Sequence, residues 1–381
     1  MKKKLALLGG GHAHLQIMHA LAQQRVTGLD VLLIASSRFQ CSASLLPGWI
    51  AGAYSQAEIS IDLVRLTRAA GVRLVLEPIA GIDASRRCIG LTTGKHIEYD
   101  ALSIDVGSET DTSWLEILGD KLLPVRPIDR FLAGWTKTWD IAKARGAFRL
   151  GVIGAGPTGV ELALATQYAF RSAGVKGEVV LIGSDAGVLP GLSKSIRARA
   201  QRTLELAGIE MHFARGVGSE DGVLLSNGQL VHADQVIAAT GARPAIWLRV
   251  SKLGVNDKGL VLVDKYHRSV THPSVFVLGD ICINTDAALT QHGYRYGCVG
   301  SILLKNIVAS LNGSSLQSFT LSKRSLILLS REDGYAIASW GRWSIEGRWA
   351  WHLKNLIERR SIKRLHKTTI PKAIGILEQS Q

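Results

Sequence analysis

The sequence predicts an α/β protein in which two similar units each place a helix directly after a buried strand. The first observation is the apolar run 5–8, which is followed by Gly9-Gly10-Gly11 and a helical pattern that continues to Leu21. The second is the same succession near the middle of the chain, where the apolar run 148–153 precedes the glycine-rich stretch 154–159. The third is composition, because 46% hydrophobic residues and 40 glycines among 381 residues suit buried strands joined by tight turns.

The first glycine turn has the features of an anion site. Bare backbone lets a pyrophosphate approach, and the unpaired N–H groups and dipole of a helix N-terminus hold it. Gly9 and Gly11 fit the first two positions of the dinucleotide fingerprint. His14 stands at the third position, where glycine normally permits close packing of helix and strand, so we expect this helix to stand slightly further from the strand.

The second glycine turn is a complete GxGxxG between a strand and a helix, and it begins 145 residues after the first. The following strand, 178–182, ends at Gly183, where an acid would bind the ribose of NAD. With no carboxylate there to repel a 2′-phosphate, the sequence does not exclude NADPH as the cofactor, although we slightly favour NADH. Arg197 and Arg199 could meet a 2′-phosphate or be surface charges.

The rest of the first unit contains a second buried strand, 31–34, that ends in Ala35, Ser36 and Ser37 instead of an acid. The Ser36 hydroxyl is a candidate to bind an adenosine ribose. The segment 39–55 is too irregular for a helix and too apolar for an exposed loop, so it is either a buried crossover or a cofactor lining. The pattern further predicts an amphipathic helix over 59–71 and strands over 72–77, 88–92 and 101–106.

Two later strands end in motifs that resemble one another or carry an acid. The strand 236–239 runs into Thr240-Gly241, as the strand 101–106 runs into Gly107. The strand 275–278 ends in Gly279-Asp280. A carboxylate at the carboxyl end of a strand lies where open α/β sheets bind ligands, and it suits ribityl hydroxyls or water beside a pyrophosphate.

These motifs, in this order, resemble the two-dinucleotide-binding-domain flavoproteins of the pyridine nucleotide-disulfide oxidoreductase superfamily. The GGGHAH opening and the stretch 45–55 resemble type II NADH dehydrogenases and, more closely, the flavoprotein domain fused to selenophosphate synthetases, as does the stretch 339–349. The resemblance implies two Rossmann-like domains, the second inserted in the first. It implies an FAD-binding domain (1–110 and 234–315), an NAD(P)H-binding domain (111–233) and a C-terminal region (316–381).

The resemblance also implies which residues hold the cofactors FAD and NAD(P)H. Leu46 and Pro47 would lie near the isoalloxazine, and Asp280 would hold the ribityl–phosphate region. Glu161 would lie where nicotinamide meets flavin, or would serve only as an acid favoured at a helix N-terminus. The FAD residues are Gly9, Gly11, His12, Ser36, Leu46, Pro47, Gly107, Gly241, Gly279 and Asp280, and the NAD(P)H residues are Gly154, Gly156, Pro157 and Gly159.

Two departures from the family patterns bear on the electron acceptor. Disulfide reductases of the superfamily carry CxxxxC, whereas Cys41 is followed five positions on by Leu46, so Cys41 is expected to be a small buried side chain. Type II dehydrogenases carry a glutamine-rich quinone motif, to which only the stretch at Gln291 is similar. Gln291 is the candidate residue for the quinone step.

The resulting hypothesis is a flavoenzyme that passes hydride from NAD(P)H to FAD and electrons on to a small acceptor, with a quinone favoured. One alternative is a sulfide:quinone-type oxidase, for which Cys282 and Cys298 are the candidate redox pair. Another is a flavoprotein that serves a partner without turnover, for example in selenium metabolism. The hydride chemistry requires neither a catalytic triad nor a metal site, and the cysteines have no CxxC spacing that would suggest a zinc site. The sequence leaves open whether the protein forms a homodimer.

The net charge of +14 is concentrated near the C-terminus. The stretch 342–372 holds nine Lys and Arg and two acids, half of the whole excess. Within it, Trp349, Leu353, Leu356 and Ile357 have helical spacing, so the stretch 349–367 is expected either to meet a membrane surface or to pack on the body. No nucleic-acid motif accompanies the charge. Without a signal peptide or an apolar stretch of ~18 residues, we expect a cytoplasmic protein, peripheral on the membrane if bound to it.

Overall fold

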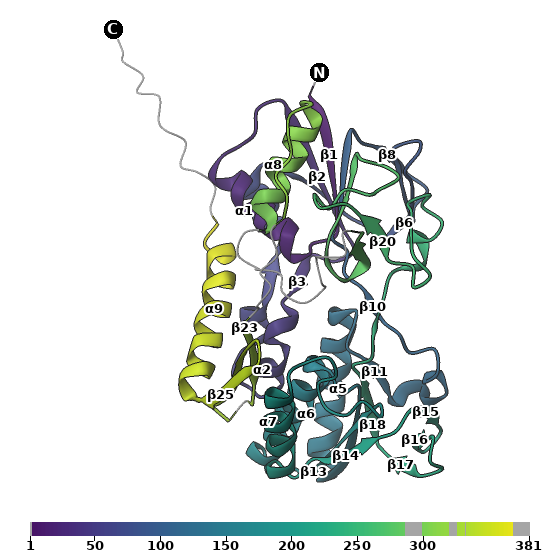
Figure 1. Cartoon of the computed structure of the whole chain (residues 1–381), viewed down its shortest axis with the longest axis vertical. Helices are drawn as coiled ribbons and strands as arrows, with labels where there is room; N and C mark the ends of the chain where they lie inside the picture. Colours follow the sequence, from purple (N-terminus) through teal and green to yellow (C-terminus); the bar gives the residue numbers. More distant parts are fainter. Residues whose placement is uncertain (1, 286–298, 320–325, 332, 369–381) are drawn as a thin grey trace.

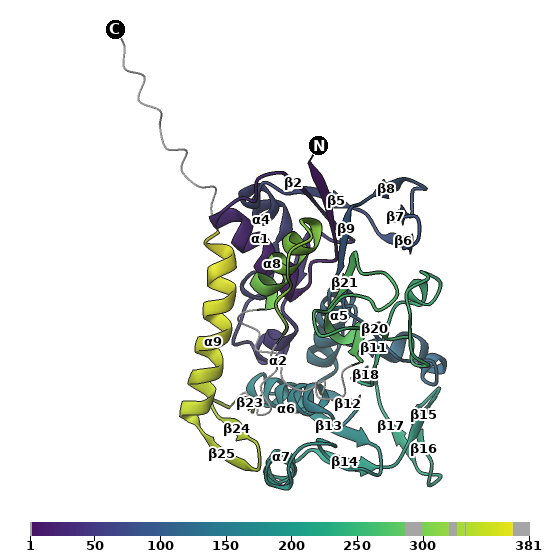
Figure 2. The same cartoon turned by 45° about the horizontal axis from the view of Figure 1, so that its top comes forward.

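The computed structural model describes residues 2–285, 299–319, 326–331 and 333–368. Two five-stranded parallel sheets belong to two bodies that follow one another along the long axis of the molecule (Figure 1). The long C-terminal helix α9 (Arg348–His366) runs beside both bodies, as the second view also shows (Figure 2). This architecture confirms the predicted α/β class with two sheet units.

The first sheet has the strand order β21-β9-β1-β2-β5, and every neighbouring pair is parallel. Its central strand β1 (Lys3–Leu8) buries residues 5–8 almost completely, because a strand covered on both faces must be apolar throughout. Helix α1 (His12–Gln23) packs against α4 (Leu63–Ala70) and α8 (Val299–Leu311). The other strands are β2 (Leu29–Ala35), β5 (Arg73–Leu76), β9 (Ala101–Ile104) and β21 (Val275–Val277).

The second sheet has the order β11-β18-β12-β13-β14 and is again parallel throughout. Helix α6 (Pro157–Ser172) packs on β12 and β13, and α5 (Ile128–Arg145) packs on β11 and β12. The strands are β11 (Leu122–Pro124), β12 (Ala147–Ile153), β13 (Lys176–Gly183), β14 (Glu210–Phe213) and β18 (Gln235–Ala238).

The chain order shows that the second unit is inserted in the first. Strand β21 joins the first sheet only after the chain has completed the second sheet. The outward and returning crossings pair with each other as the short antiparallel strands β10 (Glu109–Thr110) and β19 (Ala242–Arg243). The exact boundaries 110/111 and 233/234 stay predictions.

Smaller elements complete the described chain. A three-stranded antiparallel sheet of β23 (Leu326–Ser330), β24 (Ala336–Trp340) and β25 (Trp343–Gly347) packs against α9 and against α7 (Lys194–Leu206). The remaining helices are α2 (Leu46–Ile50), α3 (Gln56–Ile59) and the 3-10 turns η1 (Ala43–Leu45), η2 (Glu116–Lys121), η3 (Ile246–Leu248) and η4 (Gly279–Ile281). The remaining strands are β3 (Phe39–Cys41), β4 (Ser60–Asp62), β6 (Ile79–Asp83), β7 (Cys88–Leu91), β8 (His96–Glu98), β15 (Gly216–Ser219), β16 (Gly222–Leu225), β17 (Leu230–His232), β20 (Val261–Val263) and β22 (Cys282–Asn284).

Two local predictions in the first unit were wrong. The segment predicted to be too irregular for a helix contains α2, because Pro47 lies in its first turn, where the missing N–H costs nothing. The helix predicted from Ile59 begins only at Leu63. The carboxylate of Asp62 caps it by accepting from the N–H of Val64 at 2.9 Å, and residues 60–62 form strand β4 beside β3.

The predicted C-terminal helix exists and has one buried and one partly exposed face. Ala350, Lys354, Ile362 and Leu365 face the body, whereas Trp349, Leu356 and Ile357 remain about half exposed. The helix therefore packs on the body and still presents apolar side chains outward. Within the part of the chain that the structure describes, no helix is both long and apolar enough to span a bilayer.

Candidate functional site

The first glycine turn is shaped by close contact with the segment that follows β9. Gly9 has a φ of +87°, and a Cβ there would lie 2.6 Å from the Cα of Val106. A Cβ at Gly11 would overlap the carboxylate of Asp105. Both positions therefore require glycine, for steric reasons that the sequence pattern anticipated.

Asp105 is a residue of this turn that the sequence analysis did not single out. Its backbone oxygen accepts from the N–H of Gly11 at 3.1 Å, and its buried carboxylate accepts from the N–H of Ala13 at 3.0 Å. A carboxylate at a helix N-terminus is favoured by the dipole and satisfies an otherwise unpaired donor. Asp105 thus fixes α1 against β9. In the sequence, the position of Asp105 between a buried strand and Gly107 was the feature that could have indicated this role.

His14 occupies the third fingerprint position and is completely buried. Its Nδ1 donates to the carbonyl of Gly9 at 2.7 Å, which leaves Nε2 to accept from the hydroxyl of Ser103 at 2.8 Å. Burial lowers the pKa of His14, although the nearby Asp105 opposes this effect, so the neutral ring is favoured.

The matching position of the second turn cannot hold such a side chain. A Cβ at Gly159 would overlap the carbonyl oxygen of Gly154. Both helices begin three residues after the first glycine of their turns, so the registers agree. An imidazole therefore fits beside the glycine carbonyl of the first turn, to which it donates, whereas even a Cβ does not fit at the matching position of the second turn.

The predicted residues of the first unit come together at the carboxyl ends of β1, β9 and β21, which are neighbours in the sheet. Gly9 follows β1, Gly107 comes three residues after β9, and Gly279 comes two residues after β21. Within the described chain, a Cβ at Gly107 would meet no atom within 4 Å, so this part of the edge is open. Ser36 follows β2, the next strand along, and is exposed.

Asp280 has a partner that the sequence did not indicate. Arg126, between β11 and α5 of the second unit, donates from one nitrogen to Asp280 at 2.6 Å and to the hydroxyl of Ser108. Because 154 positions separate Arg126 from Asp280, no local pattern could reveal this pair. The pair joins the two units beside the sheet edge where the FAD residues were predicted.

His12, the first residue of α1, is held from the side of α8. Its Nε2 accepts from the Gln16 amide at 2.8 Å, and the Gln16 oxygen accepts from the N–H of Gly300 at 2.8 Å. A side chain at the first helical position faces any anion bound at the helix N-terminus.

The second glycine turn has the same construction. Gly154 has a φ of +115°, and a Cβ there would lie 2.7 Å from the carbonyl carbon of Ala239. Cβ atoms at Gly156 and Gly241 would meet nothing within 4 Å in the described chain, so both positions border open space. Pro157 is the first residue of α6 and lacks only an N–H that would have no helical partner.

Glu161, on the second turn of α6, is held by the C-terminal region. Its Oε1 accepts from the Lys354 ammonium on α9 and from the N–H of Ser330 on β23 at 2.8 Å. The two charged side chains are only 14% and 10% exposed. The carboxylate therefore ties α6 to two C-terminal elements, a role beyond the two that the sequence suggested.

Leu46 and Pro47 lie in α2, are buried, and belong to a helix that packs against α6. The expected flavin lining is thus next to the helix that begins at the second glycine turn. Cys41 is partly buried, its thiol lies 3.3 Å from the Ser60 hydroxyl, and burial raises its pKa. These facts agree with a small structural side chain.

The two arginines considered for a 2′-phosphate have other contacts. Arg197 donates from Nε to the carbonyl of Val188 at 2.9 Å and from its terminal nitrogen to that of Ala186, so it braces the loop after β13. Arg199 donates from Nε to the Ser344 hydroxyl at 3.1 Å. A side chain at Gly183 would collide with Ala155, since its Cβ would lie 2.7 Å from the Ala155 Cβ.

Two predicted residues cannot be placed, because Gln291 and Cys298 lie outside the described residues. Cys282 is described and is buried. Its thiol donates to the carbonyl of Val277 at 3.3 Å, and burial raises its pKa far above the usual range. A thiol in this setting is not a ready nucleophile.

Comparison with known proteins gives a consistent family. A family model described as pyridine nucleotide-disulphide oxidoreductase matches residues 3–297. A type II NADH:quinone oxidoreductase of Mycobacterium tuberculosis is 24% identical, with 92% of this chain and 81% of that protein covered. An NADH dehydrogenase-like protein of Bacillus subtilis is 21% identical, covering 73% and 76%. The resemblance read from the motifs to this superfamily and to type II dehydrogenases is thereby confirmed.

Solved structures agree on the fold. The sulfide:quinone oxidoreductase of Aquifex aeolicus superposes with a TM-score of 0.80 at 16% identity, covering 97% of this chain and 93% of that one. The water-forming NADH oxidase of Lactobacillus brevis, bound to NADH, gives 0.71 at 20% identity, covering 89% and 75%. Identities this low establish the shared architecture alone.

Proposed function

The chain belongs to the pyridine nucleotide-disulphide oxidoreductase family, and we propose that it is an FAD-dependent NAD(P)H dehydrogenase that reduces a quinone. The cofactors are those of the family, FAD and NAD(P)H. The observation that carries the proposal is the packing of α2 against α6. The segment assigned to the flavin and the helix assigned to the nicotinamide dinucleotide are neighbours, as hydride transfer between the two cofactors requires.

The described residues fit the two cofactors. Each glycine turn leads into a helix N-terminus, and the open space at Gly107, Gly156 and Gly241 lets a dinucleotide approach the backbone. FAD supplies the chemistry, accepting hydride from reduced nicotinamide and releasing electrons to the acceptor. We assign FAD to the first turn with Gly279 and Asp280, and NAD(P)H to the second.

The protein's own contribution in this proposal is orientation and electrostatics. Arg126 donates to the Asp280 carboxylate and fixes its direction, so that it can accept from a ribityl hydroxyl. Glu161 and Lys354 fix α9 to α6, which keeps the C-terminal region in place against the second unit. No acid–base pair is needed for the hydride step.

The sulfide:quinone alternative is disfavoured by Cys282. Sulfide oxidation needs two reactive thiols, whereas the Cys282 thiol is buried and donates a hydrogen bond to a backbone carbonyl. The resemblance to the solved sulfide:quinone oxidoreductase concerns the fold and does not supply the missing thiol chemistry.

The enzymatic test uses purified, FAD-loaded protein with NADH and a short-chain quinone. We expect flavin absorbance to fall on adding NADH, return with quinone, and NADH to be consumed catalytically. Bleaching that is stoichiometric and not followed by turnover contradicts the dehydrogenase and favours a partner-serving flavoprotein. Bleaching by sulfide in place of NADH favours the sulfide oxidase.

We further propose that the C-terminal region meets the membrane surface. Strands β24 and β25 expose Trp340, Trp343 and Ile345 by 57%, 83% and 55%, next to the basic helix α9. Exposed tryptophans beside cations suit the bilayer interface. Replacing Trp343 and Ile345 by serine should abolish pelleting with anionic liposomes, whereas Trp114→Ser, at a side chain 41% exposed elsewhere, should not. Unchanged pelleting of the first variant contradicts the proposal.

Point substitutions test the membrane contact better than removal of α9, because a chain without the helix would leave the buried Glu161 carboxylate without its ammonium partner. A homodimer remains compatible with the proposed function, and sedimentation velocity of the FAD-loaded protein measures it directly.

A further inference from the structure

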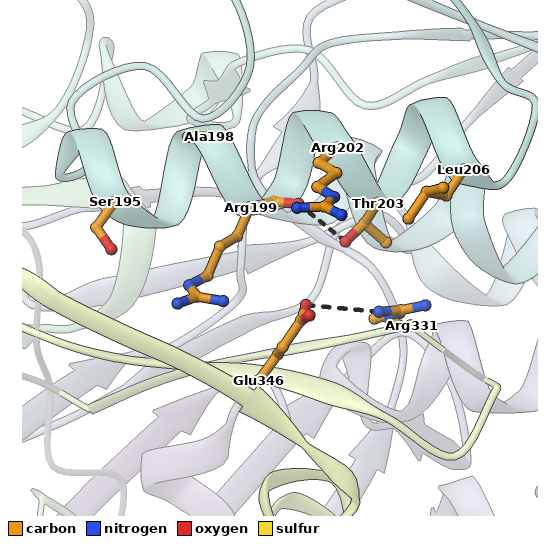
Figure 3. Close-up of a pocket in the computed structure, with 8 residues that line it drawn as sticks. All are labelled: Ser195, Ala198, Arg199, Arg202, Thr203, Leu206, Arg331 and Glu346. Atoms are coloured by element: carbon orange, nitrogen blue, oxygen red, sulfur yellow. Dashed lines mark hydrogen bonds and ion pairs between the residues drawn. The ribbon is translucent and has the colours of Figure 1, made fainter.

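A cavity of about 490 Å³ lies between α7 and the C-terminal sheet (Figure 3). Its walls come from one face of α7 and from strands β23 and β25, and none of its lining residues belongs to either glycine turn. The cavity is thus separate from the proposed cofactor residues and needs its own explanation.

The helical wall is basic because of its spacing. Ser195, Arg199 and Arg202 are four and three residues apart, so they lie on one face of α7. The opposite flank of the helix buries Ile196, Ala200 and Leu204 in the core, which fixes the direction in which the arginines point. Figure 3 shows Arg199 projecting from the helix toward the sheet, with Arg202 on the next turn of the same helix.

The strand wall adds a third guanidinium. Arg331, directly after β23, faces the helix from the other side of the cavity (Figure 3). It forms ion pairs with Asp333 at 3.0 Å and, at a longer 3.5 Å, with Glu346 on β25. Its Nε is buried and finds no acceptor among the described residues.

The charges of the cavity do not balance. Among the described residues, Arg199 donates to the neutral Ser344 hydroxyl, and neither Arg199 nor Arg202 forms an ion pair with a carboxylate. Among the described lining residues, Glu346 is the single acid, against three arginines. Arg149, by contrast, has its guanidinium between two glutamates at 3.2 and 2.5 Å.

We propose that this cavity binds a small phosphate-bearing anion that accepts hydrogen bonds from Arg199, Arg202 and Arg331. Guanidinium groups are planar, permanently charged and matched to the oxygens of phosphate, which several can share. A bound anion would bridge α7 and the C-terminal sheet, and it would satisfy the donors that the protein leaves without acceptors. The proposal does not depend on the proposed electron transfer.

The test is calorimetric titration of pyrophosphate into FAD-loaded protein at constant ionic strength, with NAD⁺ present to occupy the second glycine turn. We expect saturable binding and a rise in unfolding temperature. Arg202→Gln should weaken binding about tenfold or more, since it removes a charge-assisted pair. Arg130→Gln is the matched control, because Arg130 is also an exposed helical arginine without an ion pair in the described residues.

A second arm identifies the source of the phosphate group. Phosphatidylglycerol vesicles replace pyrophosphate, with phosphatidylcholine as the comparison. Binding to the former that requires Arg202, without an effect of pyrophosphate, assigns the cavity to a lipid headgroup. The proposal is overturned if neither probe binds saturably, or if binding is the same in Arg202→Gln and the wild type.

Discussion

His14 offers the sharpest test of how the first glycine turn is built. We consider His14→Ala, which removes both the donor to Gly9 and the acceptor from Ser103. A buried polar group left without its partner costs about 1–3 kcal/mol, and this change leaves two of them. The emptied space around a fully buried ring adds to that loss. We therefore expect a destabilisation of at least about 3 kcal/mol.

The assay is thermal unfolding of the FAD-loaded protein, followed by the flavin fluorescence that appears when the cofactor is released. For a unit of roughly 150–250 residues, about 3 kcal/mol corresponds to a drop of about 6–12 °C. Because His14 lies in the first turn of α1, we also expect weaker FAD binding. His232→Ala is the control, since His232 is exposed on β17.

Ser103→Ala separates the two bonds. Alone it should cost about 1 kcal/mol, and in the His14→Ala background it should cost nothing further, because its partner is already gone. A His14→Ala protein that unfolds within about 2 °C of the wild type would refute the idea that the imidazole supports the turn.

Three further outcomes are expected. Burial lowers the pKa of His14 and of His267, so the unfolded chain takes up protons below pH ~6.5 that the folded chain refuses. Stability is thus complete above that pH and falls below it by up to about 1.4 kcal/mol per unit for each histidine, measurable by urea unfolding between pH 5 and pH 7.5; a flat profile contradicts this. Lys354→Met should lower the free energy of unfolding by about 3–5 kcal/mol, because it leaves the buried Glu161 carboxylate without a cation. The double variant Lys354→Met with Glu161→Gln should lose clearly less, because it leaves no buried charge unpaired. Gly159→Ala should abolish NADH binding in equilibrium dialysis while FAD stays bound, since its Cβ overlaps the Gly154 carbonyl; retained affinity would show that α6 can shift.

The glycine turns and their flanking elements could be predicted because the information is local. A buried strand covered on both faces reads as an apolar run, and positive φ at Gly9 and Gly154 selects glycine whatever the distant surroundings are. The repeat of the pattern and the later strand ending at Gly279 carried the family resemblance, and that resemblance implied the inserted arrangement.

Predictions from local patterns were incomplete where a nearby cap or strand pairing, or contacts with distant parts of the chain, determined the structure. The helix predicted from Ile59 lost its first turn to the Asp62 cap and to strand pairing with β3. The packing side of α9 could not be predicted from the apolar spacing of Trp349 and Leu356, because the body contacts the side with Lys354.

The sequence by itself determined two strand–glycine–helix units, their order in the chain and the family to which they belong. Each unit is recognised from spacing within about thirty residues, and the family from the succession of such motifs along the chain. Only the tertiary structure decided what surrounds the turns. Ser103 reaches His14 across 89 positions, Arg126 reaches Asp280 across 154, and Lys354 reaches Glu161 across 193. Contacts over such separations arise from how sheets and helices pack in space, and no periodicity along the chain encodes them.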